Sequence, residues 1–392
     1  MLKPFVAAVA LLGVHAHAAG VSGKAFGYAT GTTGGGDAEA AAPSDVSQLT
    51  AWLTDDTPRV ILIDKEFNYL GSAGKCNDCT CCIPDSNTCG SAGQNAIDTD
   101  SMDWCGDYPR TTCSYDKAAL EKIDVRSNKS IVGVGSKGVI RGKGLRMVSG
   151  VSNIIIQNVH FTELNPQYIW GGDAITLDGT NNIWIDHVKV SLVGRQMFVS
   201  GFEASGHVTI SNCEFDGQTN WSASCDGHHY WTVLSYGKDD QVTFTGNYIH
   251  HTSGRSPKIQ YPSHWHVYNN FWDENTGHAF DVGENGNALI EGNVFRHVNT
   301  PLLSDGAGSV FAVTQDNKAT CESTLGRTCY PNALTSSGKL AASDKSVLTS
   351  LPAGEKGVSF MKADQVRSSV VANAGVGKIG SEMVAQAERV KC

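Results

Sequence analysis

Short apolar runs recur along the middle of the chain, and each is followed by an asparagine or aspartate and a turn. The runs are VSNIIIQNVHF, TNNIWIDHVKV, GHVTISNCEF, DQVTFTGNYI, HWHVYNNFW and NALIEGNVF. Aligning them places six polar residues at one equivalent position: Asn158, Asp186, Asn212, Asn247, Asn270 and Asn293. Their spacings of 28, 26, 35, 23 and 23 residues, with almost no helical pattern between the runs, predict a solenoid.

An all-β fold, a parallel β-helix, accounts best for these features. Its interior accommodates stacked Ile and Val side chains, and an amide recurring at one bend can bond the amide of the next coil. The alternative is an antiparallel sandwich, but hairpin turns of the Asn-Gly kind do not separate the runs. Longer gaps in the repeat indicate loops that leave the coil.

A short helix is expected before the coils. In SDVSQLTAWL, Val46, Leu49 and Leu53 lie on one helical face behind a Ser44/Asp45 cap. The strand RVILID follows, so the sequence predicts a helix that packs on a strand.

Residues 1–18 have the pattern of a secretory signal peptide. Lys3 precedes an apolar run from Phe5 to Val14, and the segment ends in Ala-His-Ala. The run is about ten residues long, whereas a membrane span needs about twenty. No later segment is apolar enough to span a membrane, so we expect a secreted, extracellular protein with no membrane partner.

Residues 19–392 are expected to form a single domain. The coils should occupy about residues 130–310, with a cysteine-rich loop at about 71–115 and a tail at about 335–392. The tail has a weak helical pattern near SDKSVLTSL, and we expect it to pack along the outside of the coils.

The chain has 12 cysteines, and seven of them fall in the short stretch from Cys76 to Cys113. Outside the cell, disulfides explain such a cluster better than a metal site, although spacing does not give their connectivity. Asn128 and Asn220 begin glycosylation sequons, NKS and NWS. The formal net charge of −9 disfavours a polyanionic partner, so nucleic acid is excluded.

Polar residues gather in the loops between the runs, where binding groups tend to lie on a rigid scaffold. If the coils stack, Asp173, Arg195 and Arg255 face a common groove. Each also has a simpler interpretation, because Asp173 could cap a turn and Arg195 could form a weak surface ion pair. The adjacent His228 and His229 should point to opposite faces of a strand, and we expect no metal site.

These motifs also carry a resemblance to a known family. WGGDAIT, WIDHV, GRQ, DGHHYW, GNYIHHTSGRSPK, GHAFDVGE and EGNVF, in this order, resemble the pectin lyases of polysaccharide lyase family 1. The resemblance runs from the Gly-rich start to about residue 335, and the cysteine cluster is longer than the family's. It implies a right-handed parallel β-helix that cleaves galacturonan by β-elimination. A base removes the proton at C5, and the glycosidic oxygen at C4 leaves.

The resemblance also implies roles for particular residues. Arg255 takes the position of the catalytic base, Arg195 stabilises charge on the substrate's carboxyl group, and Asp173 orients the arginines. Arginine ordinarily keeps its proton, but repulsion from Arg195 and Lys258 favours a neutral Arg255. The residues expected to bind substrate are Lys258, Trp170, Trp231 and His229.

Related pectate lyases use calcium held by an acidic pair that follows WIDH, whereas this chain has WIDHVKVSLVGRQMFV. We therefore expect a monomeric endo-acting pectin lyase that cleaves methyl-esterified pectin without a cofactor. Three alternatives remain. A calcium-dependent pectate lyase would use Asp173 as a ligand, a hydrolase would need a pair of carboxylates, and a non-catalytic solenoid would bind carbohydrate without cleaving it.

Overall fold

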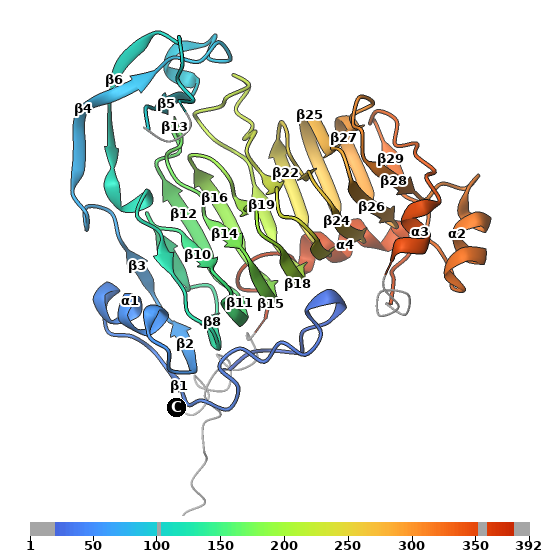
Figure 1. Ribbon diagram of the computed structural model, residues 1–392, viewed down its shortest axis with the longest axis horizontal. Coiled ribbons are helices and arrows are strands. Elements are labelled where there is room, and N and C mark those ends of the chain that lie inside the picture. Colours follow the sequence, from blue (N-terminus) through green and yellow to red (C-terminus); the bar gives the residue numbers. More distant parts are fainter. Residues whose placement is uncertain (1–19, 100–102, 352–358, 380–392) are drawn as a thin grey trace, which may run out of the picture.

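The computed structural model describes residues 20–99, 103–351 and 359–379, and it shows a parallel β-helix (Figure 1). Each coil contributes one strand to each of three sheets, here called sheets 1, 2 and 3, and every strand pair within them is parallel. The predicted fold class is confirmed. The expected signal peptide, residues 1–18, lies outside the described residues.

Sheet 1 has ten strands. They are β1 (Ala40–Ala41), β2 (Arg59–Ile63), β8 (Lys129–Gly133), β11 (Ser152–Gln157), β15 (Thr180–Asp186), β18 (Ser205–Ser211), β21 (Asp240–Thr245), β24 (Ser263–Tyr268), β26 (Gly286–Glu291) and β28 (Ser309–Ala312). The coils therefore begin before the cysteine-rich segment, well ahead of the expected start at about residue 130.

Sheets 2 and 3 are joined because the long strand β25 belongs to both. Sheet 2 consists of β3 (Glu66–Asn68), β9 (Val139–Arg141), β12 (His160–Leu164), β16 (Lys189–Val193), β19 (Glu214–Asp216), β22 (Tyr248–Thr252), β25 (Phe271–Val282), β27 (Val294–Leu302) and β29 (Ala333–Thr335). Sheet 3 consists of β7 (Ile123–Asp124), β10 (Leu145–Val148), β14 (Ile175–Asp178), β17 (Phe198–Ser200), β20 (Val233–Ser235), β23 (Lys258–Ile259) and the end of β25.

The core is a set of apolar columns that run along the coil axis. One column in sheet 1 contains Ile61, Ile131, Ile156, Ile185, Ile210, Phe244, Val267, Ile290 and Ala312. All of its members are buried. A register slip of one residue would turn every member of a strand outward, so this column fixes how the coils stack.

The expected alignment of six polar residues is wrong in part. Asp186 is level with Gln157 and Ser211 in sheet 1, not with Asn158 and Asn212. The position of those two asparagines is a bend with positive φ, and its occupants are Asn158, His187, Asn212, Gly246, Asn269 and Gly292. Asparagine and glycine favour that conformation, which explains part of the repeat.

An amide ladder exists one position beyond the bend. The side-chain amide of Asn247 donates to the Oδ1 of Asn270 at 2.9 Å, Asn270 donates to Asn293 at 2.9 Å, and Asn293 donates to Asn332 at 3.0 Å. Asn270 and Asn293 are fully buried. Two adjacent positions thus favour asparagine for different reasons, and the sequence pattern alone does not separate them.

The cysteine-rich segment is a β-structured arm rather than an irregular loop. Its small sheet contains β13 (Tyr168–Ile169), β5 (Asn95–Ile97), β4 (Lys75–Cys82) and β6 (Arg110–Asp116), and β4 pairs antiparallel with β5 and β6. The arm projects from one end of the coils (Figure 1). Disulfides join Cys76–Cys79, Cys81–Cys113, Cys82–Cys105, Cys89–Cys225 and Cys321–Cys329, and Cys213 is a buried free thiol.

Helices cover the ends and one side of the coils. They are α1 (Val46–Thr54), α2 (Lys318–Leu325), α3 (Ser346–Ser350) and α4 (Ala363–Asn373), with short 3-10 turns at Gly27–Ala29, Gly90–Ala92 and Lys117–Ala119. The Asp45 side chain accepts a hydrogen bond from the Gln48 backbone N–H at 2.9 Å, so the predicted cap of α1 is confirmed. Helix α4 packs on the outside of β25 and β27, as expected for the tail.

We predict that Asn270→Ala lowers the free energy of unfolding by about 2–3 kcal/mol, because it leaves buried partners on both sides of the ladder without a bond. Thermal unfolding followed by circular dichroism measures the effect. Asn287→Ala is the control, since that amide is only partly buried and bonds backbone carbonyls outside the ladder. Equal melting temperatures for the two variants would contradict the role of the ladder.

Candidate active site

The candidate site lies where the chain passes from sheet 2 to sheet 3. Asp173 precedes β14, Arg195 precedes β17, Trp231 precedes β20 and Arg255 precedes β23. These four strands are neighbours in sheet 3, so the loops before them lie side by side. The structure therefore brings the three predicted charged residues together from three of four consecutive coils.

Arg195 is held by stacking on an aromatic ring. The centre of its guanidinium lies 3.6 Å from the centroid of the Trp170 ring. Burial lowers the pKa of the Arg195 guanidinium, and the charge of Arg255 lowers it further, whereas Asp173 acts in the opposite direction. The influence of Arg255 shows that the two cations are close in space.

Arg255 is stacked in the same way on the next tryptophan. Its guanidinium lies 4.7 Å from the Trp231 ring and 5.6 Å from the Tyr230 ring. Its backbone has a φ of 46°, and its N–H donates to the Nε2 of His278 at 3.2 Å. The Nε2 atom of His278 must be unprotonated to accept this bond, and burial lowers the pKa of His278.

Asp173 is buried, and both of its carboxylate oxygens are engaged. Lys122 donates to one oxygen at 2.8 Å, and the backbone N–H of Gln196 donates to the other at 2.9 Å. Burial alone would raise the pKa of Asp173, but the charges of Lys122 and Arg195 outweigh it and hold the pKa below its usual value. Sequence reasoning missed Lys122, which lies far from Asp173 along the chain.

The other predicted binding residues differ in their access to substrate. Lys258 faces outward on β23 and forms an ion pair of 2.7 Å with Asp281 of the next coil. Its charge is therefore offset, and it repels Arg255 less than the sequence suggested. Trp231 is only 9% exposed, with one face against Arg255, so it supports the arginine rather than presenting an open ring.

His229 is 3% exposed and does not reach the surface of the site. Its Nε2 atom lies 2.7 Å from the carbonyl oxygen of Arg195 and 3.1 Å from that of Trp231, so it donates to them. Burial lowers the pKa of His229 to about 4, which keeps the ring neutral. We assign it a positioning role. His228, its neighbour, is more exposed, as the strand pattern predicted.

Gln94 links the arm to both arginines, and no sequence signal indicated it. Its Nε2 donates to the carbonyl oxygens of Pro166 at 2.8 Å and Gly194 at 2.9 Å. Its Oε1 accepts from the indole Nε1 of Trp231 at 3.0 Å. This fully buried side chain thus fixes both the residue before Arg195 and the ring beneath Arg255.

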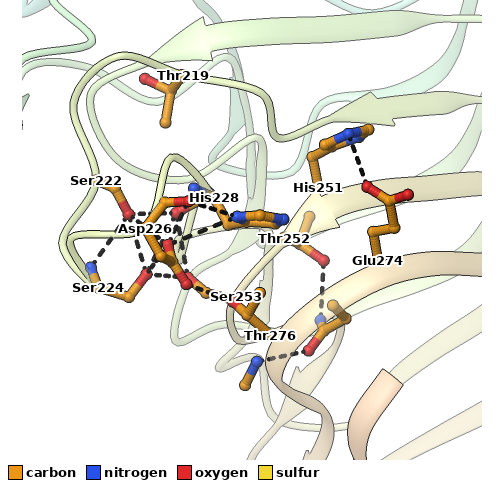
Figure 2. Close-up of polar contacts among 12 residues, drawn as sticks. Thr219, Ser222, Ser224, Asp226, His228, His251, Thr252, Ser253, Glu274 and Thr276 are labelled. Atoms are coloured by element: carbon orange, nitrogen blue, oxygen red, sulfur yellow. Dashed lines mark hydrogen bonds and ion pairs between the residues drawn. The ribbon is translucent and has the colours of Figure 1, made fainter. Parts of the chain in front are cut away.

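The long loop before Trp231 is anchored by its own polar network, which Figure 2 shows around Asp226. The Asp226 carboxylate accepts from the hydroxyls of Ser222 at 3.0 Å, Ser224 at 2.9 Å and Thr276 at 2.5 Å. Thr276 belongs to β25, so the network ties this loop to the coil two further along the β-helix. The Cys89–Cys225 disulfide ties the other side of the loop to the arm.

An aromatic surface continues from Trp170 onto the arm. Trp104 lies 6.4 Å from Trp170 and 5.8 Å from Tyr108, measured between ring centroids. A cavity of about 420 Å³ opens there, lined by Asp85, Trp104, Cys105, Gly106, Asp107, Tyr108 and Pro109. Flat apolar rings next to the arginines are suited to contact with sugar rings.

Among the described residues, three clusters have donor atoms close enough to hold a metal ion, and none contains Asp173. Lys189 lies between Glu214 and Asp216 of one cluster. Arg296 pairs with Asp273 of another. In the third, Glu291 lies beside the Cys321–Cys329 disulfide, whose sulfurs are not free to coordinate.

Comparison with known proteins gives the family. The model of the pectate lyase family matches residues 1–379. The chain belongs to the pectate lyase family. It is 67% identical to a probable pectin lyase F of Aspergillus niger over 97% of this chain and 80% of that protein. It is 48% identical to a probable pectin lyase E of Aspergillus fumigatus, over 92% of this chain and 96% of that protein. This family member is a polysaccharide lyase.

Solved structures agree on the fold of this lyase. A pectate lyase from Xanthomonas campestris superposes with a TM-score of 0.59 at 19% identity, over 91% of this chain and 99% of that chain. A pectate lyase bound to a hexasaccharide gives 0.54 at 19% identity, over 90% of this chain and 97% of that chain. These structures support the parallel β-helix fold, while the family model and the pectin lyase relatives confirm the expected membership of the lyase family.

We predict that Gln94→Ala lowers kcat by about 10- to 100-fold with a smaller change in KM, because a shift of about 1 Å in the reacting groups has effects of this size. Steady-state kinetics on pectin measures it, with near-ultraviolet circular dichroism to verify folding. Gln365→Ala, on the exposed face of α4, is the matched control. A folded Gln94→Ala enzyme with the wild-type kcat would contradict the positioning role.

Proposed function

We propose that the protein is a secreted, endo-acting pectin lyase that cleaves methyl-esterified α-1,4-galacturonan by β-elimination without calcium. The observation that carries the proposal is the pair of neighbouring arginines, each stacked on a tryptophan. The Nε atoms of Arg195 and Arg255 have no hydrogen-bond partner among the residues that the structure describes. These Nε atoms are buried, and stacking on the tryptophan rings holds both guanidinium groups at the site.

The proposed reaction needs one base and one group that stabilises negative charge. Arg255 acts as the base that removes the proton at C5, and the electron pair of the C–H bond forms the C4–C5 double bond. The C4–O bond breaks, and the leaving oxygen takes a proton from water. Charge that develops on the ester oxygen is stabilised by Arg195, which Asp173 and Trp170 hold in place. Lys258 contacts the polymer beside the cleaved bond.

A methyl ester suits this cationic site better than a free carboxylate does, because the ester needs less stabilisation of charge. The ester is already neutral, and its α-proton is more acidic than that of a carboxylate, so a fixed cation supplies enough stabilisation. The position of Asp173 supports the same substrate. Lys122 already neutralises this carboxylate, and the neighbouring cations would repel a divalent ion.

Secretion and a monomeric state are part of the proposal. The amino-terminal pattern of residues 1–18 and five disulfides support an extracellular protein. None of the described helices is long and apolar enough to cross a membrane.

We predict that the protein generates the ultraviolet absorbance of the unsaturated product from highly methylated pectin, and that a chelator leaves the rate unchanged. Polygalacturonate should give less than a tenth of that rate, with or without added calcium. Activity on polygalacturonate that a chelator abolishes would instead indicate a calcium-dependent pectate lyase. If neither polymer yields the absorbance, the protein is a hydrolase or a non-catalytic solenoid. An assay for released reducing ends separates these two, because only the hydrolase produces them.

Arg255→Ala is expected to lower kcat on pectin by about 10²- to 10⁴-fold, the contribution typical of a base in the transition state. Arg195→Glu should also lose activity, because it puts negative charge where charge develops. Arg126→Ala is the control, since Arg126 is exposed and pairs with Asp56 on the surface. Retention of the wild-type rate by either active-site variant, with its fold intact, would remove that residue from the mechanism.

A further inference from the structure

Three aromatic side chains form an exposed strip just after the C-terminal ends of strands in sheet 3. The arginines lie before the N-terminal ends of these strands. Phe202, Tyr236 and Tyr261 follow β17, β20 and β23, which are consecutive in the sheet. Phe202 is 57% exposed and Tyr261 is 39% exposed. Neighbouring rings contact edge to face, with centroids 6.0 Å apart for Phe202 and Tyr236 and 5.5 Å apart for Tyr236 and Tyr261.

The strip and the arginines flank the same narrow face. Strands β17, β20 and β23 have only two or three residues each, so the face between their ends is about 10 Å wide at about 3.3 Å per residue. Lys258 points outward on this face, three positions before Tyr261 along the chain.

The backbone beneath the strip is held rigidly by a buried carboxylate. Asp240 accepts from the hydroxyls of Ser200 at 2.5 Å and Ser235 at 2.8 Å, and from the backbone N–H of Ser205 at 2.8 Å. The Tyr236 backbone N–H also donates to the carbonyl oxygen of Ser200 at 3.1 Å. The segments that carry Phe202 and Tyr236 are therefore fixed relative to each other before any ligand binds.

The charges around the strip favour an uncharged ligand. Glu203 is exposed beside Phe202, Asp239 is exposed beyond Tyr236, and Asp178 accepts from the Glu203 backbone N–H at 2.9 Å. Lys238 lies 3.8 Å from Glu203, and Lys258, also on this face, is paired with Asp281. A polymer of free carboxylates would be repelled here, whereas a methyl-esterified one would bring its apolar ring faces and ester methyls without charge.

We propose that Phe202, Tyr236 and Tyr261 form a second wall of the substrate site, an aromatic contact surface for methyl-esterified galacturonosyl residues on either side of the cleaved bond. The proposal rests on the proposed function and adds to it a specific surface for the ester. Three consecutive coils each contribute one ring, and neighbouring coils are about 4.8 Å apart along the coil axis. A linear polymer that binds parallel to this axis along sheet 3 therefore contacts the rings one after another. The arginines then contact the reacting residue from the opposite edge.

The test measures polymer binding apart from turnover. In an Arg255→Ala background, Tyr236→Ala and Tyr261→Ala should each weaken the affinity for highly methylated pectin about tenfold, or about 1.4 kcal/mol, in affinity electrophoresis. Tyr236→Phe should keep most of the affinity, because the contact needs the ring rather than the hydroxyl. Val371→Ala is the control, since Val371 is 47% exposed on α4, far from sheet 3. In otherwise wild-type enzyme, the same alanine variants should raise KM by a similar factor.

Wild-type affinity in folded Tyr236→Ala and Tyr261→Ala proteins would overturn the proposal. An equal loss of affinity for polygalacturonate would overturn its preference for the ester. If Tyr236→Ala fails to fold, Phe202→Ala, at the most exposed ring, replaces it. Affinity electrophoresis measures binding without turnover, so these outcomes are distinct from failure of the proposed function. Failure of the proposed function would be a wild-type protein that cleaves neither polymer.

Discussion

The in-register stacking of parallel coils is the constraint on which the rest of the structure depends. Each strand bonds the strand one coil away, and a continuous apolar column, which includes Ile156 and Ile185, fixes the register. Loops that leave equivalent points of successive coils must then lie beside each other. This arrangement brings Arg195 and Arg255 together although other secondary structure separates them along the chain.

Stacking places the loops, and buried polar groups fix their conformation. Gln94 and His229 bond backbone carbonyls of the segment that carries Arg195, and Asp226 fastens the long loop before Trp231. A buried polar group without a partner is costly, so satisfied networks of this kind permit few alternative loop conformations. The arm shares this function, because Gln94 and the Cys89–Cys225 disulfide connect it directly to the loops.

Local electrostatics at the site differ from those of the whole chain. The net charge is −9, but Lys122 and Arg195 act on the Asp173 carboxylate before the strands of sheet 3, and Arg255 acts on Arg195. Stacking on Trp170 and Trp231 holds the two arginines, and neither forms an ion pair with another residue in the part of the chain that the structure describes. A site of this kind stabilises negative charge that develops during a reaction, which is the demand that elimination next to a carbonyl makes.

The sequence by itself determined the solenoid, the cap of α1, the disulfide-rich segment and the charged loops, because each depends on local spacing or residue type. It did not separate the bend at Asn158 from the ladder at Asn270, since both positions favour asparagine. Only the tertiary structure decided that His229 is buried, that Lys258 pairs with Asp281, and that Gln94 joins the arm to the arginines. These contacts form between coils, and their geometry depends on loop lengths and stacking register, which no local pattern encodes.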